Sequence, residues 1–120
     1  MTSEEAYNKA KKSGYTKELE EIVCKNTYYA YNFALDVSGA NIEYCQEWAC
    51  KNPEYAYSFA FHITGADIEY CQELACKDPW YAYNFALYVP EADLNYCLKA
   101  CKGTEWYSKL QELIMEEALG

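Results

Sequence analysis

The chain of 120 residues contains no arginine: its ten basic residues are all lysine, against 19 acidic residues and a net charge of −9. Proteins that bind nucleic acids neutralise phosphates with clustered cations, and arginine is prominent among them. The composition therefore argues against a nucleic-acid partner and against an anionic membrane surface. Such an acidic surface favours a basic protein partner, or serves only to keep the protein in solution.

Proline and glycine are also scarce, with three and five residues, and His62 is the only histidine. Since 52% of the residues are hydrophobic, the chain can build a core and is not expected to be disordered. Its start, MTSEEAYNKAKKSG, lacks the apolar stretch of a secretory signal, and no run approaches the roughly 18–20 apolar residues of a membrane span. The composition predicts a cytoplasmic protein with no membrane segment.

What the chain does have is a repeat of 26 residues, present three times in succession. The units are residues 24–49, 50–75 and 76–100, the last one residue shorter, and a further CK begins at Cys101. The second unit reads CKNPEYAYSFAFHITGADIEYCQELA. A period between about 20 and 50 residues indicates an architecture in which each unit buries its apolar face on its neighbours.

Each unit is predicted to begin with a short helix. Asn52-Pro53 is typical of a helix start, because Asn caps free amides and Pro at the first position loses only an unpaired amide. Gly65 is expected to end this helix, and Pro90-Glu91 replaces that glycine in the third unit, so the turn there should differ. The helix carries one apolar stripe at helical spacing: Tyr55, Ala56, Phe59, Ala60 and Ile63.

A second helix is predicted to follow, capped by Asp67. Its apolar face consists of Ile68, Cys71, Leu74 and Ala75. The polar residues Glu69, Gln72 and Glu73 are expected to face away from this core. Because helices this short are marginal alone, the stability must come from stacking.

Both ends are predicted to be capping segments, residues 1–23 and 101–120. The first contains a degenerate helix at Ser3–Ser13 and a second helix capped by Thr16. The last helix is expected to be capped by Thr104 and to bury Trp106, Leu110, Leu113 and Ile114. The whole chain, residues 1–120, is thus predicted to be one all-α domain, a short α-solenoid of stacked two-helix repeats with about nine short helices.

The segment NPEYAYSFAFHITGADIEYCQELACKDPWYAYNFA resembles a short repeat of uncharacterised phage and bacterial proteins, of the form D-P-x-Y-A-Y-x-F-A-x-x-V-x-G-A-D-I-E-x-L-Q. The resemblance covers residues 26–100. It implies an all-helical repeat in a phage or mobile-element setting, and it implies no activity. The chain differs from that pattern by cysteine where leucine is usual, at Cys45, Cys71 and Cys97.

Seven cysteines form two columns along the repeat. Cys45 and Cys50 are five residues apart and diverge by roughly 140° on a helix, which disfavours a shared metal ion. Bridges along a column are disfavoured because stacked helices lie roughly 8–10 Å apart, but a bridge between the two columns of adjacent units stays open. An odd number without a signal peptide favours packing as small apolar residues.

Two sets of residues are candidates for binding a partner. Glu43, Glu47, Glu69 and Glu73 should form a ridge across two units, either a solvated face or a docking surface for a basic partner. The ridge stops in unit three, where Asn95, Leu98 and Lys99 replace the acids. A second set lies outside the core stripe of the first helices, with Trp80 and Tyr88 on one exposed face: Tyr28, Glu54, Trp80 and Tyr88.

These patterns favour a binding protein that grips another protein, which is expected to be basic. No nucleophile–base pair or ligand set is visible, so neither an enzyme nor a cofactor is expected, and His62 is interpreted as an exposed residue. Together with the phage-like resemblance, these patterns lead to the hypothesis that the protein inhibits a host protein such as a defence nuclease, in the manner of an anti-CRISPR factor. The protein would then be located in the host cytoplasm. The alternative is a self-assembling structural protein, and either a monomer or a homodimer fits this length.

Overall fold

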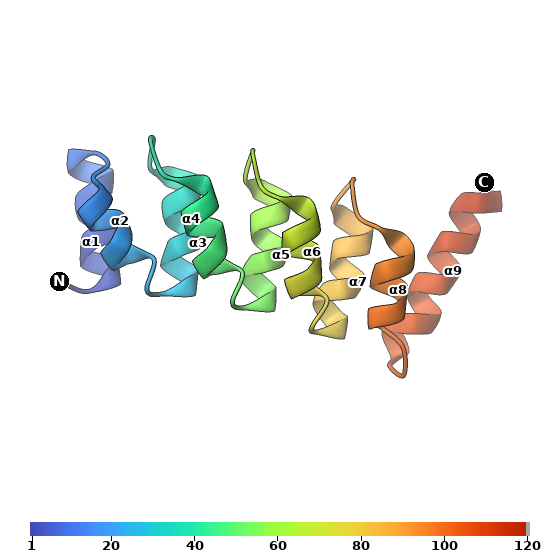
Figure 1. Cartoon of the computed structure of the whole chain (residues 1–120). Coiled ribbons are helices and arrows are strands. Elements are labelled where there is room, and N and C mark those ends of the chain that lie inside the picture. Colours follow the sequence, from blue (N-terminus) through green and yellow to red (C-terminus); the bar gives the residue numbers. More distant parts are fainter. Residues whose placement is uncertain (120) are drawn as a thin grey trace.

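The computed structural model describes residues 1–119, and within that range it contains nine α-helices and no strand (Figure 1). The helices are α1 Ser3–Ser13, α2 Lys17–Val23, α3 Thr27–Asp36, α4 Ile42–Ala49, α5 Pro53–His62, α6 Ile68–Ala75, α7 Pro79–Tyr88, α8 Leu94–Ala100 and α9 Glu105–Leu119. The all-α class and the pairing of short helices into repeated units are confirmed.

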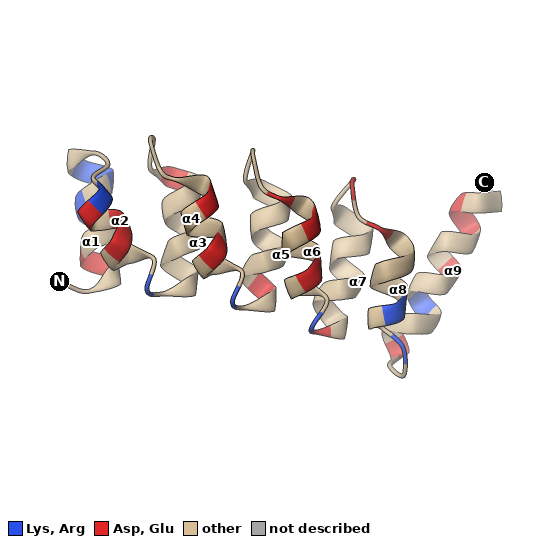
Figure 2. Ribbon diagram, viewed as in Figure 1, with Lys and Arg blue, Asp and Glu red and all other residues tan. Residues whose placement is uncertain are grey.

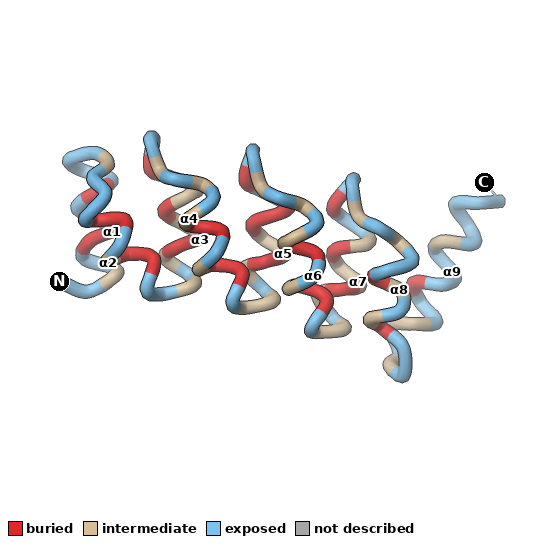
Figure 3. The backbone as a smooth tube through the Cα atoms, in the orientation of Figure 1, coloured by how far each residue is buried: buried red, intermediate tan, exposed pale blue. Residues whose placement is uncertain are grey.

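The helices form two layers in an elongated body of 52 × 25 × 17 Å. In the first layer the odd-numbered helices α1, α3, α5, α7 and α9 lie side by side in chain order, and each contacts the next. In the second layer each of α2, α4, α6 and α8 packs on the helix before it and touches the helix after it (Figure 1). Buried residues run as a continuous seam between the layers (Figure 3).

The helices begin where their capping residues predict. Asn52 accepts a hydrogen bond from the amide of Glu54, with Pro53 at the first position of α5. Asp67 accepts one from the amide of Tyr70 at the start of α6. The same arrangement recurs in the other two units, at Asn26, Asn41, Asp78 and Asp93.

The turn inside each unit differs from the prediction. The first helix ends before the glycine: α5 ends at His62, and Ile63 follows in extended conformation as a buried cap residue. Gly65 lies two residues further on, with a φ of 91° that favours glycine. In the third unit Glu91 takes that place without a positive φ, yet the hydrogen bond that closes the turn, 3.0 Å from the Ala92 amide to the Val89 carbonyl, is kept. The expected difference is therefore confined to the middle of the turn.

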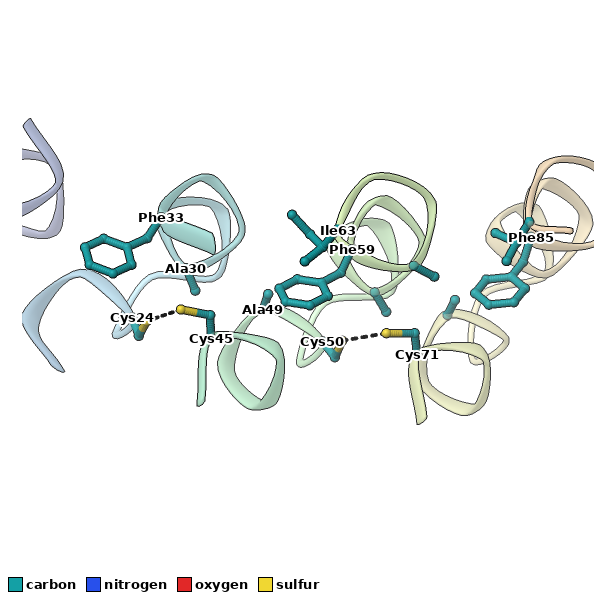
Figure 4. Packing of buried hydrophobic residues seen from close by; sticks show 14 of the residues in the cluster. Cys24, Ala30, Phe33, Cys45, Ala49, Cys50, Phe59, Ile63, Cys71 and Phe85 are labelled. Carbon is teal, nitrogen blue, oxygen red and sulfur yellow. Dashed lines mark hydrogen bonds between the residues drawn. The ribbon is translucent and has the colours of Figure 1, made fainter. Parts of the chain in front are cut away.

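Each unit contributes one phenylalanine to the seam between the layers. Phe33, Phe59 and Phe85 are fully buried and lie in equivalent orientations (Figure 4). Columns of alanine beside them, such as Ala30 and Ala56, allow the first-layer backbones to approach closely. Repetition of one packing arrangement therefore accounts for the core.

Helices lie in both segments that are predicted to cap the stack. Thr2 and Glu5 form a reciprocal capping box at the start of α1. Thr104 precedes α9 as expected, but its hydroxyl donates to the carbonyl of Cys101 instead of capping the new helix. Leu110 is buried in α9, whereas Leu113, which is predicted to be buried, is exposed at a hollow between α7, α8 and α9.

Candidate functional site

The four predicted glutamates lie in two successive clefts between neighbouring second-layer helices. Glu43 and Glu47 line the first cleft, between α4 and α6, with Gln46, Gly65, Asp67 and Tyr70; its volume is about 480 Å³. Glu69 and Glu73 line the second, between α6 and α8, with Ile68, Gln72, Glu91, Asp93 and Tyr96; its volume is about 590 Å³. The repeat therefore produces two copies of one acidic cleft.

The floor of each cleft corrects the sequence interpretation. Gln72 is predicted to face away from the core, yet Gln72 and its equivalent Gln46 are both buried. The Oε1 of Gln46 accepts a 2.7 Å hydrogen bond from the amide of Asp67, and that of Gln72 accepts an equal bond from the amide of Asp93. Each glutamine thus ties its own unit to the capping residue of the next.

Glu20 occupies the same position at the first junction. Its Oε2 accepts from the Asn41 amide at 2.7 Å, and its Oε1 accepts from the Tyr15 hydroxyl at 2.8 Å. The hydrogen bond to Glu20, together with burial, raises the pKa of Tyr15 to about 12. Glu20, Gln46 and Gln72 are named here the junction acceptors, and Leu98 stands in the corresponding place of the last unit.

Replacing Glu20 with leucine should lower the free energy of unfolding by about 2–4 kcal/mol, since the Asn41 amide and the Tyr15 hydroxyl both lose their acceptor. Glu20→Gln is the matched control, because Gln46 and Gln72 show that an amide oxygen serves in this position. Its loss should stay below about 1 kcal/mol. Urea titration followed by circular dichroism measures the free energy of unfolding of both variants. Equal losses would show that the acceptor oxygens of Glu20 do not account for its contribution to stability.

The predicted aromatic residues lie on the first layer and do not form one site. Tyr28, Glu54 and Trp80 are all exposed, as their equivalent positions predict. Trp80 packs against Trp106 of α9, with ring centroids 4.6 Å apart. The ring centroid of Tyr88 lies 6.4 Å from that of Phe61 in α5, on the other side of α7. Trp80 and Tyr88 are thus both exposed, as predicted, but they contact helices on opposite sides of α7, because a first-layer helix has a neighbour on each side.

The acidic clefts and the exposed aromatic residues belong to opposite faces. Figure 2 shows acidic residues along α2, α4 and α6 of the second layer, with lysines at the turns that join successive units. The exposed apolar side chains of the first layer point away from the shared core: Tyr28, Leu35, Phe61, Trp80 and Leu87. Because one flat partner cannot cover both sets, they form two separate surfaces.

The cysteines pair across the unit junctions. Between sulfur atoms, Cys24 lies 3.7 Å from Cys45 and Cys50 lies 3.6 Å from Cys71 (Figure 4). Cys76 lies 3.8 Å from Cys97 in the same way. All seven cysteines are free and buried, with Cys101 directed at the Pro79 carbonyl. The two columns of adjacent units thus meet as thiols, and the pKa of Cys50 is raised by its hydrogen bond with Cys71 and by burial.

These thiols should be nearly inert in the folded protein, because all seven are buried and a dissolved reagent cannot reach them. An aromatic disulfide reagent at pH 8 is expected to modify them at least about 100-fold more slowly in native buffer than in denaturant, where all seven should react. Fast native labelling of even one thiol would contradict the buried packing.

The remaining candidate from the sequence is the single histidine. His62 is exposed, with its ring 4.6 Å from that of Phe61. Over the described part of the chain, no three His, Cys, Asp or Glu side chains are grouped as metal ligands. None of the helices described is both long and apolar enough to cross a membrane.

Comparison with protein-family models, with curated proteins and with solved structures finds no match.

Proposed function

We propose that the protein is a protein–protein interaction module that binds a basic partner through the two acidic clefts of its second layer. The observation that carries this proposal is the repetition: the same pair of glutamates and the same tyrosine wall recur one unit apart. Repeat proteins use such series of equivalent surfaces to grip extended targets. With a net charge of −9, the protein would also attract a basic partner over a distance.

In its more specific form the proposal is that the partner is a host nuclease and that the protein inhibits it. Nucleases carry basic clefts for phosphate, and a row of carboxylates can occupy such a cleft in place of nucleic acid. The charge of the second layer and the resemblance of the repeat to phage proteins support this form. It predicts that inhibition competes with nucleic acid and weakens as the salt concentration rises.

Affinity capture from bacterial lysate tests the proposal, with the protein immobilised and the bound fraction identified by mass spectrometry. The lysate is treated with nuclease in a parallel sample, so that a protein bridged by nucleic acid is lost. One stoichiometric basic protein, retained in both samples and released by about 0.5 M salt, is the expected result. Retention of nothing but the bait would contradict it.

Self-assembly is the second candidate, and it has its own observation. The last helix leaves apolar side chains uncovered, Leu113, Met115 and Leu119, beside a hollow of about 320 Å³ between α7, α8 and α9. A second chain could bury these residues and continue the stack. Light scattering over a series of concentrations separates the two: a monomer at all concentrations favours the partner, and a growing mass favours assembly.

A further inference from the structure

The amide nitrogens of Gln46 and Gln72 give the clefts a property that carboxylates alone lack. Both glutamines are more than nine-tenths buried, with 7% and 6% of their surfaces exposed, and each Oε1 is held by the next unit. Neither Nε2 donates to any residue among 1–119. Neither is sealed in the core, because no fully buried polar side-chain atom there lacks a partner. Each Nε2 is therefore an unpaired donor with some exposure to solvent, and its glutamine lines the cleft.

A donor on the floor and carboxylates at the rim together describe a particular ligand. The donor needs an acceptor such as a backbone carbonyl, and the carboxylates need a cation. A lysine or arginine residue in a peptide offers both groups. Tyr70 in the first cleft and Tyr96 in the second add an aromatic wall against which the apolar stem of such a side chain can lie.

The spacing of the clefts favours one backbone conformation. Five first-layer helices span the 52 Å length of the molecule, so each unit advances the stack by roughly 10 Å, as expected for packed helices. A polyproline II segment has three residues per turn and rises about 3.1 Å per residue, or about 9 Å per turn. Its side chains at every third position point the same way, and its carbonyls have no internal partners.

We propose that the two clefts bind one basic segment in polyproline II conformation, with lysine or arginine at positions three residues apart. One cation lies between Glu43 and Glu47 and the other between Glu69 and Glu73. The Nε2 atoms of Gln46 and Gln72 donate to backbone carbonyls of the same segment. This inference rests on the function proposed above and specifies what the basic partner presents.

The neighbouring junctions show why the site has two cations and no more. At the first junction Glu20 uses both carboxylate oxygens within the protein, and Lys17 stands where Glu43 stands one unit later. In the third unit Leu98 and Lys99 replace the glutamine and the second glutamate. Neither place therefore offers a free amide donor with a pair of carboxylates.

Fluorescence anisotropy with two labelled peptides tests the spacing on the wild-type protein. Both peptides contain two lysines among prolines; in one the lysines are three residues apart, and in the control they are adjacent. The spaced peptide is expected to bind at least about 10-fold more tightly, since only it reaches both clefts. Equal affinities would overturn the proposed three-residue spacing of the two cations. They would still agree with a basic partner that is bound by charge alone.

The double variant Gln46→Glu, Gln72→Glu separates hydrogen bonding from charge. Glu20 shows that a carboxylate can serve as junction acceptor, so the fold should persist, checked by circular dichroism. The added negative charges would strengthen a purely electrostatic site, whereas loss of the two donors should weaken the spaced peptide about 10-fold. Tighter binding would overturn the inference. If neither peptide binds while the lysate partner is still retained, the inference fails and the proposed function stands; if no basic partner is retained either, both fail.

Discussion

Reversing Glu43, Glu47, Glu69 and Glu73 to lysine together is expected to weaken binding of the basic partner at least about 100-fold. Each cleft would then present two cations to a cation, and like charges placed together across an interface cost several kcal/mol. The fold should survive, because all four side chains are exposed. Each reversal changes the charge by two, so the net charge would move from −9 to −1.

A matched control removes the same charge from elsewhere. Reversal of Glu54, Glu112, Glu116 and Glu117 gives the same net charge, but these residues lie on the first layer and on α9. Titration of the captured partner against both variants by calorimetry should show strong loss for the cleft variant and a loss below about 10-fold for the control, since long-range attraction is screened by salt. The reverse order would move the site to the aromatic face, and equal loss would reduce the effect to net charge.

The period of the sequence was enough to predict the architecture. One unit repeated three times requires each apolar stripe to be buried on the next unit, and the capping residues mark where the helices begin. What the pattern could not show was what lies opposite a residue at a unit junction. That depends on the neighbouring unit's loop, which is distant in sequence.

Gln46 and Gln72 illustrate the limit. As a polar helix residue Gln72 is predicted to lie on the outside, although it is only about 60° from the buried Ala75 on a helical wheel. A signal was present: Glu20, Gln46 and Gln72 form one column of hydrogen-bond acceptors, and the column ends at Leu98, after which no further loop of this kind follows. When a column of polar residues is present only in units that are followed by another unit, it indicates a contact between successive units.

The contacts of the cysteines and of the exposed aromatic residues could not be predicted from the sequence for the same reason. The two cysteine columns were visible, but their meeting at each junction depends on how one second-layer helix approaches the next. Trp80 and Tyr88 are both exposed on α7, yet they contact helices on opposite sides of it. Periodicity defines which face of a helix is buried, whereas these contacts depend on the order of the stack.

Replacing Phe59 with alanine is expected to be the most destabilising single change in the core, lowering the free energy of unfolding by about 3–5 kcal/mol. Phe59 is fully buried between the layers in the middle unit. Since a repeat protein is stabilised by contacts between nearest neighbours, a cavity there weakens the junctions on both sides. For a chain of this size the midpoint of thermal unfolding should fall by about 10–20 °C.

Phe61→Ala is the control, because it makes the same substitution two residues away on α5, where the side chain is 47% exposed. Its effect should stay below about 1 kcal/mol, since little buried volume is lost. Calorimetry of both variants decides whether the seam between the layers carries the stability. If the two midpoints fell equally, the exposed rings would be part of a buried interface, and self-association of the first layer would then explain why the chain keeps so many aromatic side chains on that face.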